Sequence, residues 1–195
     1  MKTSISATSV AANTTGFASN VTGATWTLTA TTSGDSLAHL VTIHNDSATD
    51  HSAKTATIVG TDGDGNVQTE TLNLPAGTAT VTSTKYFGSV ISVTPSATIG
   101  ADTMDIGWAA GSVSGWKYFK ENPGQFAVGF GCLVASGSPN YSVQHQYGDG
   151  TAFTHSVVTG KTANADGSYL VPITAMRLMF TAAGGVNLTA IQYGA

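Results

Sequence analysis

The chain has 195 residues, of which 41% are hydrophobic and only 9% are charged, and its formal net charge is −4. This length suits one large domain or two small ones, and the apolar content is enough for a buried core. The seven lysines and arginines form no cluster, which argues against nucleic acid as a partner. No apolar run approaches the roughly 18 residues of a membrane span, so we expect no membrane partner.

Serine and threonine take the place of charged residues over much of the chain. Threonine favours strands through its branched Cβ and offers a hydroxyl to water. A weakly charged surface suits contact with other proteins, because few ions must lose their hydration when it is covered. Cys132, the single cysteine, lies in an apolar segment and is expected to be a buried thiol. Since the chain starts with no apparent signal peptide, we expect synthesis in a reducing cytoplasm.

Apolar and polar residues alternate with a period of two through most of the chain, and no segment shows a helical period. This pattern predicts an all-β fold of two small antiparallel β-sandwich modules, immunoglobulin-like or jelly-roll-like, with minimal helix. Residues 1–23 are rich in small polar residues and are expected to form an N-terminal arm. The first module is expected at 24–110, a connector at 111–124 and the second module at 125–195.

The first predicted module is a series of short strands. Its clearest part is residues 54–96, where strands alternate with turns such as Thr61–Asn66 in the manner of a β-meander. Further along, Met104, Ile106 and Trp108 share one face of a strand, which is expected to face the core. Strands are predicted at Ala24–Ala30, Ala38–His44, Lys54–Gly60, Val67–Leu74, Thr78–Thr84, Tyr86–Val93 and Thr103–Ala109.

The second predicted module follows the connector, which contains Trp116, Tyr118 and Phe119. These three aromatic residues are expected to pack between the two modules, and they are candidate interaction residues. Strands of the second module are predicted at Phe126–Ala135, Tyr141–Tyr147, Phe153–Thr159, Tyr169–Val171, Thr174–Thr181 and Val186–Tyr193.

Two histidines in the second module are candidate interaction residues as well. A hairpin centred on Gly150 would place His145 opposite His155, beside a facing pair of Tyr147 and Phe153. Two imidazoles across a ladder could bind a transition metal, or they could form a half-buried pair at a subunit contact. Two ligands make a weak metal site, so no metal is predicted there.

The remaining polar motifs favour turns over chemistry. Asp62, Asp64, Asn66 and Glu70 have the alternate oxygen ligands of a calcium loop, but Asp-Gly and Gly-Asn are also strong hairpin signals, so a plain turn is favoured. The chain has no nucleophile elbow, zinc-protease motif, phosphate loop or dinucleotide fingerprint. We therefore expect no enzymatic activity, no catalytic residues and no cofactor.

Two stretches resemble virion structural β-sandwich proteins of tailed bacteriophages, of the capsid decoration or cement type. The first is TIVGTDGDGNVQTETLNLPAGTATVTSTKYFGSVISVTPS, which is similar to a hairpin and strand pair found in such proteins. The second is the C-terminal DGSYLVPITAMRLMFTAAGGVNLTAIQYGA, which is similar to the closing strands of phage β-sandwich modules.

The resemblance implies a non-catalytic protein that binds the major capsid protein lattice at the capsid surface and stabilises the shell. It also implies self-association, commonly as a homotrimer. Two alternatives remain open: a neck, collar, tail or tail-fibre adaptor, and a glycan-binding virion module in which Trp116 is the best placed aromatic residue.

Overall fold

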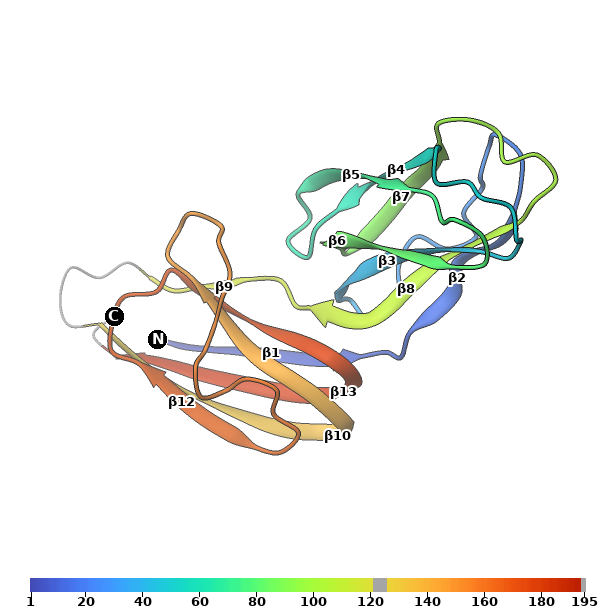
Figure 1. The fold of residues 1–195 in the computed structure, drawn as a ribbon. Coiled ribbons are helices and arrows are strands. Elements are labelled where there is room, and N and C mark those ends of the chain that lie inside the picture. Colours follow the sequence, from blue (N-terminus) through green and yellow to red (C-terminus); the bar gives the residue numbers. More distant parts are fainter. Residues whose placement is uncertain (121–125, 194–195) are drawn as a thin grey trace. The chain divides into compact units, whose positions relative to one another are not determined.

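The computed structural model describes residues 1–120 and 126–193. Within these residues the regular secondary structure consists of β-strands alone. The prediction of an all-β chain is confirmed for these residues. The chain divides into two compact units, shown in Figure 1. Unit 1 consists of Met1–Val10 and Val113–Ala195, and unit 2 consists of Ala11–Ser112.

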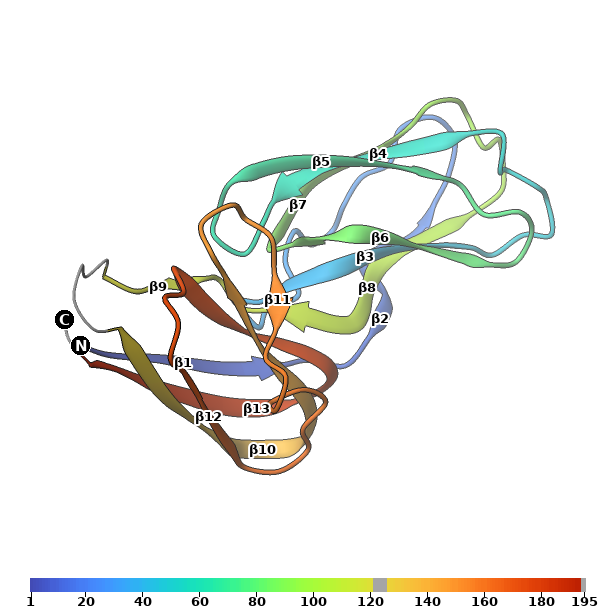
Figure 2. The ribbon, with the colours of Figure 1, turned by 60° about the vertical axis from the view of Figure 1, so that its left-hand side comes forward.

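Unit 2 is built from two sheets, as Figure 2 shows. The first has the strand order β2-β8-β3-β6, and the second has the order β5-β4-β7. The pairs β2–β8, β3–β6, β4–β5 and β4–β7 are antiparallel. The strands are β2 (Asn13–Val21), β3 (Ala38–Asn45), β4 (Thr55–Thr61), β5 (Val67–Asn73), β6 (Thr80–Phe87), β7 (Ser89–Pro95) and β8 (Met104–Val113).

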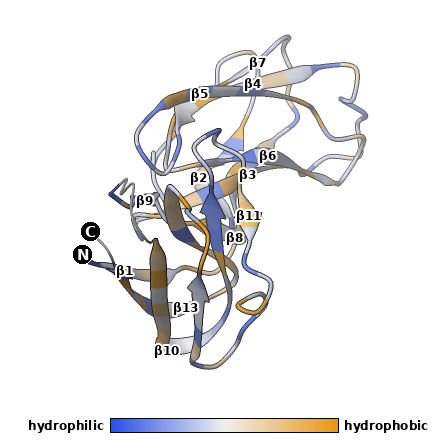
Figure 3. Cartoon of the chain, turned by 90° about the vertical axis from the view of Figure 1, so that its left-hand side faces the viewer, coloured by the Kyte–Doolittle hydropathy of each residue, from blue (hydrophilic) through white to orange (hydrophobic). Residues whose placement is uncertain are grey.

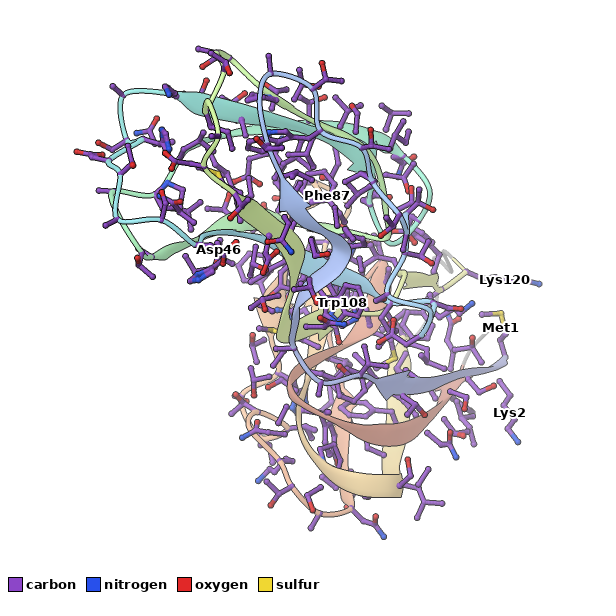
Figure 4. The ribbon with its side chains drawn as sticks, turned by 90° about the vertical axis from the view of Figure 1, so that its right-hand side faces the viewer. Met1, Lys2, Asp46, Phe87, Trp108 and Lys120 are labelled. Atoms are coloured by element: carbon purple, nitrogen blue, oxygen red, sulfur yellow. The ribbon has the colours of Figure 1, made fainter. Side chains whose placement is uncertain are left out.

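The core of unit 2 includes the predicted face of β8. Met104, Ile106 and Trp108 are all buried, which confirms the assignment from the two-residue period. The ring of Trp108 meets Phe17 of β2 edge to face at 5.1 Å, and its indole N–H donates to the Ala11 carbonyl at 3.0 Å. Figure 4 labels Trp108 and Phe87, which is another buried residue of unit 2.

The predicted β-meander is only partly present in unit 2. The hairpin of β4 and β5 forms as expected, but β6 pairs with β3 in the other sheet instead of with β5. Side chains join β5 to β6 in place of a backbone ladder. The Glu70 carboxylate accepts from the Thr84 and Lys85 amides at 2.8 and 2.9 Å, and the Lys85 ammonium donates to the Thr69 carbonyl at 2.8 Å.

Unit 1 is organised around two long strands that pair antiparallel over nearly their whole lengths. β10 (Ala127–Gln146) and β13 (Ala175–Tyr193) run side by side from the Ala127–Tyr193 pair to the Gln146–Ala175 pair. β1 and β9 pair with β13, and β11 and β12 pair with β10. These shorter strands are β1 (Lys2–Ser9), β9 (Lys117–Tyr118), β11 (Phe153–Thr154) and β12 (Ala165–Tyr169).

The long ladder of unit 1 bends near its middle. Its register shifts between Val134 and Tyr141, and Gly137 and Gly184 lie there with positive φ. A Cβ on Gly184 would approach the Pro139 nitrogen to 2.7 Å, so a side chain at that position would clash with the bend. Cys132 lies just before the bend and is buried, which confirms the prediction, and burial raises the pKa of its thiol to about 12.

The structure corrects the expected N-terminal arm. Residues 1–23 contain β1, which pairs with β13, and β2, which pairs with β8. Ile5 and Ala7 of β1, and Phe17 of β2, are buried, so these strands contribute to the cores of both units. Unit 2 follows β1 in sequence and precedes the rest of unit 1, so unit 1 is discontinuous rather than a C-terminal module.

Two further sequence predictions differ from the structure. Ala24–Ala30 is not a strand. The Thr29 and Ala30 amides both donate to the Phe17 carbonyl of β2, so this segment contacts β2 without forming a ladder with it. The predicted connector 111–124 is partly regular structure, since β8 extends through Val113 and β9 follows it. Residues 121–124 of that connector lie outside the described residues.

Removing the Glu70 carboxylate is expected to weaken unit 2. Glu70→Ala should reduce the free energy of unfolding by about 1–3 kcal/mol, because two backbone amides of β6 lose a charged acceptor. Urea denaturation followed by tryptophan fluorescence measures this. Glu70→Gln keeps one acceptor oxygen and should lose less. Equal stability of Glu70→Ala and the unmodified chain would show that this contact does not hold β6 to β5.

Candidate functional site

The most distinctive group of side chains in unit 1 is an aromatic and histidine cluster on β10, β11, β12 and the segment after β11. Tyr169 lies at its centre, with its ring centroid 4.8 Å from that of His145, 5.0 Å from that of His155 and 5.6 Å from that of Phe130. The members of this cluster, called the aromatic cluster below, are Phe130, His145, Tyr147, Phe153, His155 and Tyr169.

The two predicted histidines therefore belong to one cluster, but not as a cross-strand pair. In the β10–β11 ladder His145 faces Phe153, not His155, so the register differs by two residues from the predicted hairpin. The chain leaves the ladder after Thr154, and the His155 amide donates to the Val143 carbonyl instead. His145 and His155 come together because both rings pack against Tyr169.

Hydrogen bonds fix the orientation of both imidazoles. The His155 Nδ1 accepts from the amides of Val157 and Val158 at 3.2 and 3.1 Å, so this nitrogen carries no proton. The His145 Nδ1 lies 3.1 Å from the Tyr169 hydroxyl. Neither geometry resembles a metal site, and no group of three or more His, Cys, Asp or Glu side chains suited to a metal occurs among the described residues.

Burial sets the protonation of the cluster. It lowers the pKa of His145, and the nearby His155 lowers the pKa further, because a second positive charge would be repelled. Burial raises the pKa of the Tyr169 phenol, so the hydroxyl keeps its proton. At neutral pH Tyr169 is therefore able to donate to a neutral His145.

The outer rim of the aromatic cluster is exposed to solvent. Tyr147 and Phe153 are 50% and 43% exposed, and their ring centroids lie 5.5 Å apart. They flank the turn in which the Thr151 amide donates to the Asp149 carboxylate at 2.9 Å. The cluster thus presents two aromatic rings to solvent on a base of buried ones. Figure 3 colours the chain by hydropathy and includes this end of β11.

The three predicted aromatic residues near β9 do not form a single site. Trp116 is half-buried and lies under the Arg177 guanidinium, 4.4 Å from its ring centroid. Arg177 in turn donates from Nε to the Gln144 side chain at 2.8 Å. Phe119 is buried and meets Phe126 edge to face, whereas Tyr118 is 61% exposed.

Three histidine–aspartate pairs occur in unit 2, and the longest, at 3.6 Å, is the partly exposed His44–Asp46 pair. The geometry of the other two is structural. His39 Nε2 lies 2.8 Å from the Asp35 carboxylate, but the nearby Ser33 hydroxyl donates to that carboxylate and not to the imidazole. A nucleophilic serine needs the imidazole as its partner. Asp35 also accepts from the Leu37 amide, so its carboxylate holds the turn that precedes β3.

The second pair ties two loops of unit 2 together. His51 Nε2 lies 3.0 Å from the Asp102 carboxylate, and the Lys54 ammonium lies 3.1 Å from His51 Nδ1. Lys54 also donates to the Thr98 carbonyl at 2.8 Å. These hydrogen bonds join His51 and Lys54, in the loop before β4, to Asp102 and Thr98, in the loop before β8. The set therefore anchors the two loops to each other.

The predicted alternative of a calcium loop can be compared with the hairpin between β4 and β5. One Asp62 carboxylate oxygen accepts from the amides of Asp64 and Asn66, both at 2.9 Å, and the other accepts from the Asn66 side chain at 3.0 Å. The Asp62 carboxylate closes its own turn, which is the geometry expected of a plain hairpin turn.

Sequence reasoning missed two members of the aromatic cluster, Phe130 and Tyr169. It placed Tyr147 and Phe153 beside the two histidines, because these residues flank an Asp-Gly turn in an aromatic-rich hairpin. Phe130 and Tyr169 join the cluster through the β10–β12 ladder, whose partners are far apart in sequence.

Comparisons of the chain with protein-family models, with curated proteins and with solved structures gave no match. Within the described residues, no helix has the length and apolar character needed to cross a membrane.

Acidification is expected to destabilise unit 1 through His145. Its pKa is lowered from 6.5 in the folded chain, so the unfolded chain binds the proton more readily. The stability that neutral His145 contributes is therefore fully present above the pKa of this histidine in the unfolded chain, and it is lost as the pH falls below that pKa. Urea denaturation at a series of pH values between neutral and mildly acidic should show this loss.

His145→Phe is the informative variant for that series, because it keeps an aromatic ring and removes the titrating group. Its stability should fall less on acidification than that of the unmodified chain, since all other histidines are unchanged. Parallel pH profiles for the two chains would contradict the assignment to His145.

Proposed function

We propose that this chain is a non-catalytic structural protein of a tailed-bacteriophage virion, most specifically a capsid decoration protein that binds the major capsid protein lattice. Two features support the proposal besides the sequence resemblance. They are the distribution of exposed apolar side chains and the structural geometry of the histidine–aspartate pairs.

The distribution of exposed large apolar residues is the observation that carries the proposal. Twelve such residues are exposed in the described chain, and only Val67 and Ile91 belong to unit 2. Unit 1 therefore holds most of the exposed apolar side chains that a contact with another protein would bury. The ten in unit 1 are Met1, Tyr118, Leu133, Tyr147, Phe153, Val157, Leu170, Val171, Ile191 and Tyr193.

The low charge of the chain suits attachment to a protein shell. Only 9% of its residues are charged, so covering its surface removes few ions from water. A β-framework also loses little backbone freedom when it binds, because its main chain is already held by ladders. Weak contacts of this kind become strong when they are repeated over a lattice. Unit 1 is the expected attachment surface.

The copy number of the chain per purified particle tests the proposal. Quantitative mass spectrometry should find many copies, in a simple ratio to the major capsid protein, because decoration follows the lattice. A few copies per particle would instead place the protein at the neck, collar or tail. Absence from the particle would overturn the virion assignment.

A glycan-binding role is the second candidate, and the exposed Tyr147–Phe153 pair favours it. Exposed aromatic faces are suited to stacking on sugar rings. Tyr147→Ala should then abolish binding on a glycan array, while Tyr118→Ala, which removes an exposed aromatic ring outside the cluster, should not. Binding that survives Tyr147→Ala, or no binding by the unmodified chain, would remove this candidate.

A further inference from the structure

β1 forms an edge of the unit 1 sheet. It pairs with β13 on one side, and no strand among the described residues pairs with its other side. The ladder with β13 is continuous from Lys2–Ile191 to Ser9–Gly184, without a register shift. β1 has eight residues, contains no proline and carries its only charge at Lys2.

The hydrogen bonds at the start of β1 identify the backbone groups that face outward. Met1 and Gln192 exchange both bonds, at 2.8 and 2.7 Å, so this is a hydrogen-bonded pair of the antiparallel ladder. Such pairs alternate with pairs that exchange no bond. The amides and carbonyls that point away from β13 are therefore those of Lys2, Ser4, Ser6 and Thr8.

The side chains of these four residues are exposed as well. Figure 4 labels Met1 and Lys2 at the start of the strand, where the Lys2 side chain extends away from the ribbon. The free edge therefore presents four N–H donors and four C=O acceptors, flanked by small side chains and a single ammonium group.

Several other edges in the two units are short or protected against strand addition, and β12, which pairs only with β10, is an edge of five residues. β9 and β11 have only two residues each, and β2 has repeated register shifts against β8. β5 and β6 are joined by the Glu70 carboxylate, and the first part of β7 is covered where the Val90 amide donates to Thr31. Natural sheets protect exposed edges in such ways, so a long regular edge without protection indicates a strand partner.

We propose that β1 pairs with β1 of a second copy of this chain, antiparallel and about a two-fold axis, with Lys2 opposite Thr8 and Ser4 opposite Ser6. In this register all four outward residues of each strand form hydrogen-bonded pairs with the other copy. Sliding the strands by two residues leaves one outward residue of each copy without a partner. The register is thus the one that satisfies the most backbone groups.

The charges of β1 fit a second copy. In the proposed register the two Lys2 ammonium groups lie at opposite ends of the paired strands, about 20 Å apart along the strand direction. Each faces the Thr8 hydroxyl, so no like charges oppose one another across the pair. A two-fold contact of this kind is self-complementary, which is the usual arrangement of homodimers.

This contact involves one strand from each copy and is smaller than a standard interface, so association depends on protein concentration. It does not rest on the proposed role in the virion, and it predicts a dimer rather than the trimer that the resemblance implies. The mass of the assembly in solution therefore distinguishes the proposed dimer from a trimer.

Ser6→Pro is the variant that tests the edge. Proline removes the outward amide and the hydroxyl of Ser6 but no backbone hydrogen bond to β13, and edge strands tolerate it at such positions. Ser6→Ala is the matched control, because it also removes the Ser6 hydroxyl bond to Asn187 but keeps the amide. Circular dichroism confirms that both variants are folded.

Sedimentation equilibrium over a range of concentrations should show a monomer–dimer equilibrium for the unmodified chain and for Ser6→Ala. The dimer of Ser6→Pro should be weaker by about tenfold or more. A monomer at every concentration, a trimer, or a dimer that Ser6→Pro leaves unchanged would each overturn the proposal.

Cross-linking tests the register and does not depend on the proline variant. Ser4→Cys and Ser6→Cys chains, mixed and oxidised, should form a disulfide-linked heterodimer, because facing residues of a hydrogen-bonded pair have Cα atoms about 5.5 Å apart. Either variant alone should cross-link much less. A mixture that cross-links no better than the separate variants would show that the edges do not meet in this register.

Discussion

The antiparallel pairing of β10 with β13 is the constraint on which the rest of unit 1 depends. Every other strand of that unit pairs with one of these two, β1 and β9 with β13, and β11 and β12 with β10. The side chains that the two strands turn inward, including Val128, Val143, Leu178 and Leu188, are fully buried. Burial of this apolar surface provides the driving force for a contact between segments far apart in sequence.

The bend in that ladder also creates the aromatic cluster. Phe130 lies near one end of β10 and His145 near the other, yet both rings contact Tyr169. A straight strand would separate these two residues by about 50 Å. Because the ladder turns at Gly137 and Gly184, its two halves cover a common core, and β12 delivers Tyr169 between them.

The surface of unit 1 combines two features that suit assembly: exposed apolar side chains and an open strand edge. The first offers area and the second offers directed hydrogen bonds, so they fit different kinds of partner. Unit 2 has fewer exposed apolar groups, and side chains such as Glu70 close its sheet edges. These contrasts are the reason that the proposed partner contacts are assigned to unit 1.

The all-β class, the β4–β5 hairpin, the core face of β8 and the buried Cys132 could all be predicted from the sequence alone, because each depends on local alternation, turn residues or apolar context. The strands in residues 1–23 were missed, because the strands that they pair with, β13 and β8, are distant in sequence. Nor could the contacts of His145 and His155 be predicted, because a two-residue shift keeps the same faces and only packing against Tyr169 decides between registers. These features could be seen only in the folded chain, because they are stabilised by burial against residues far away in sequence, which local patterns do not encode.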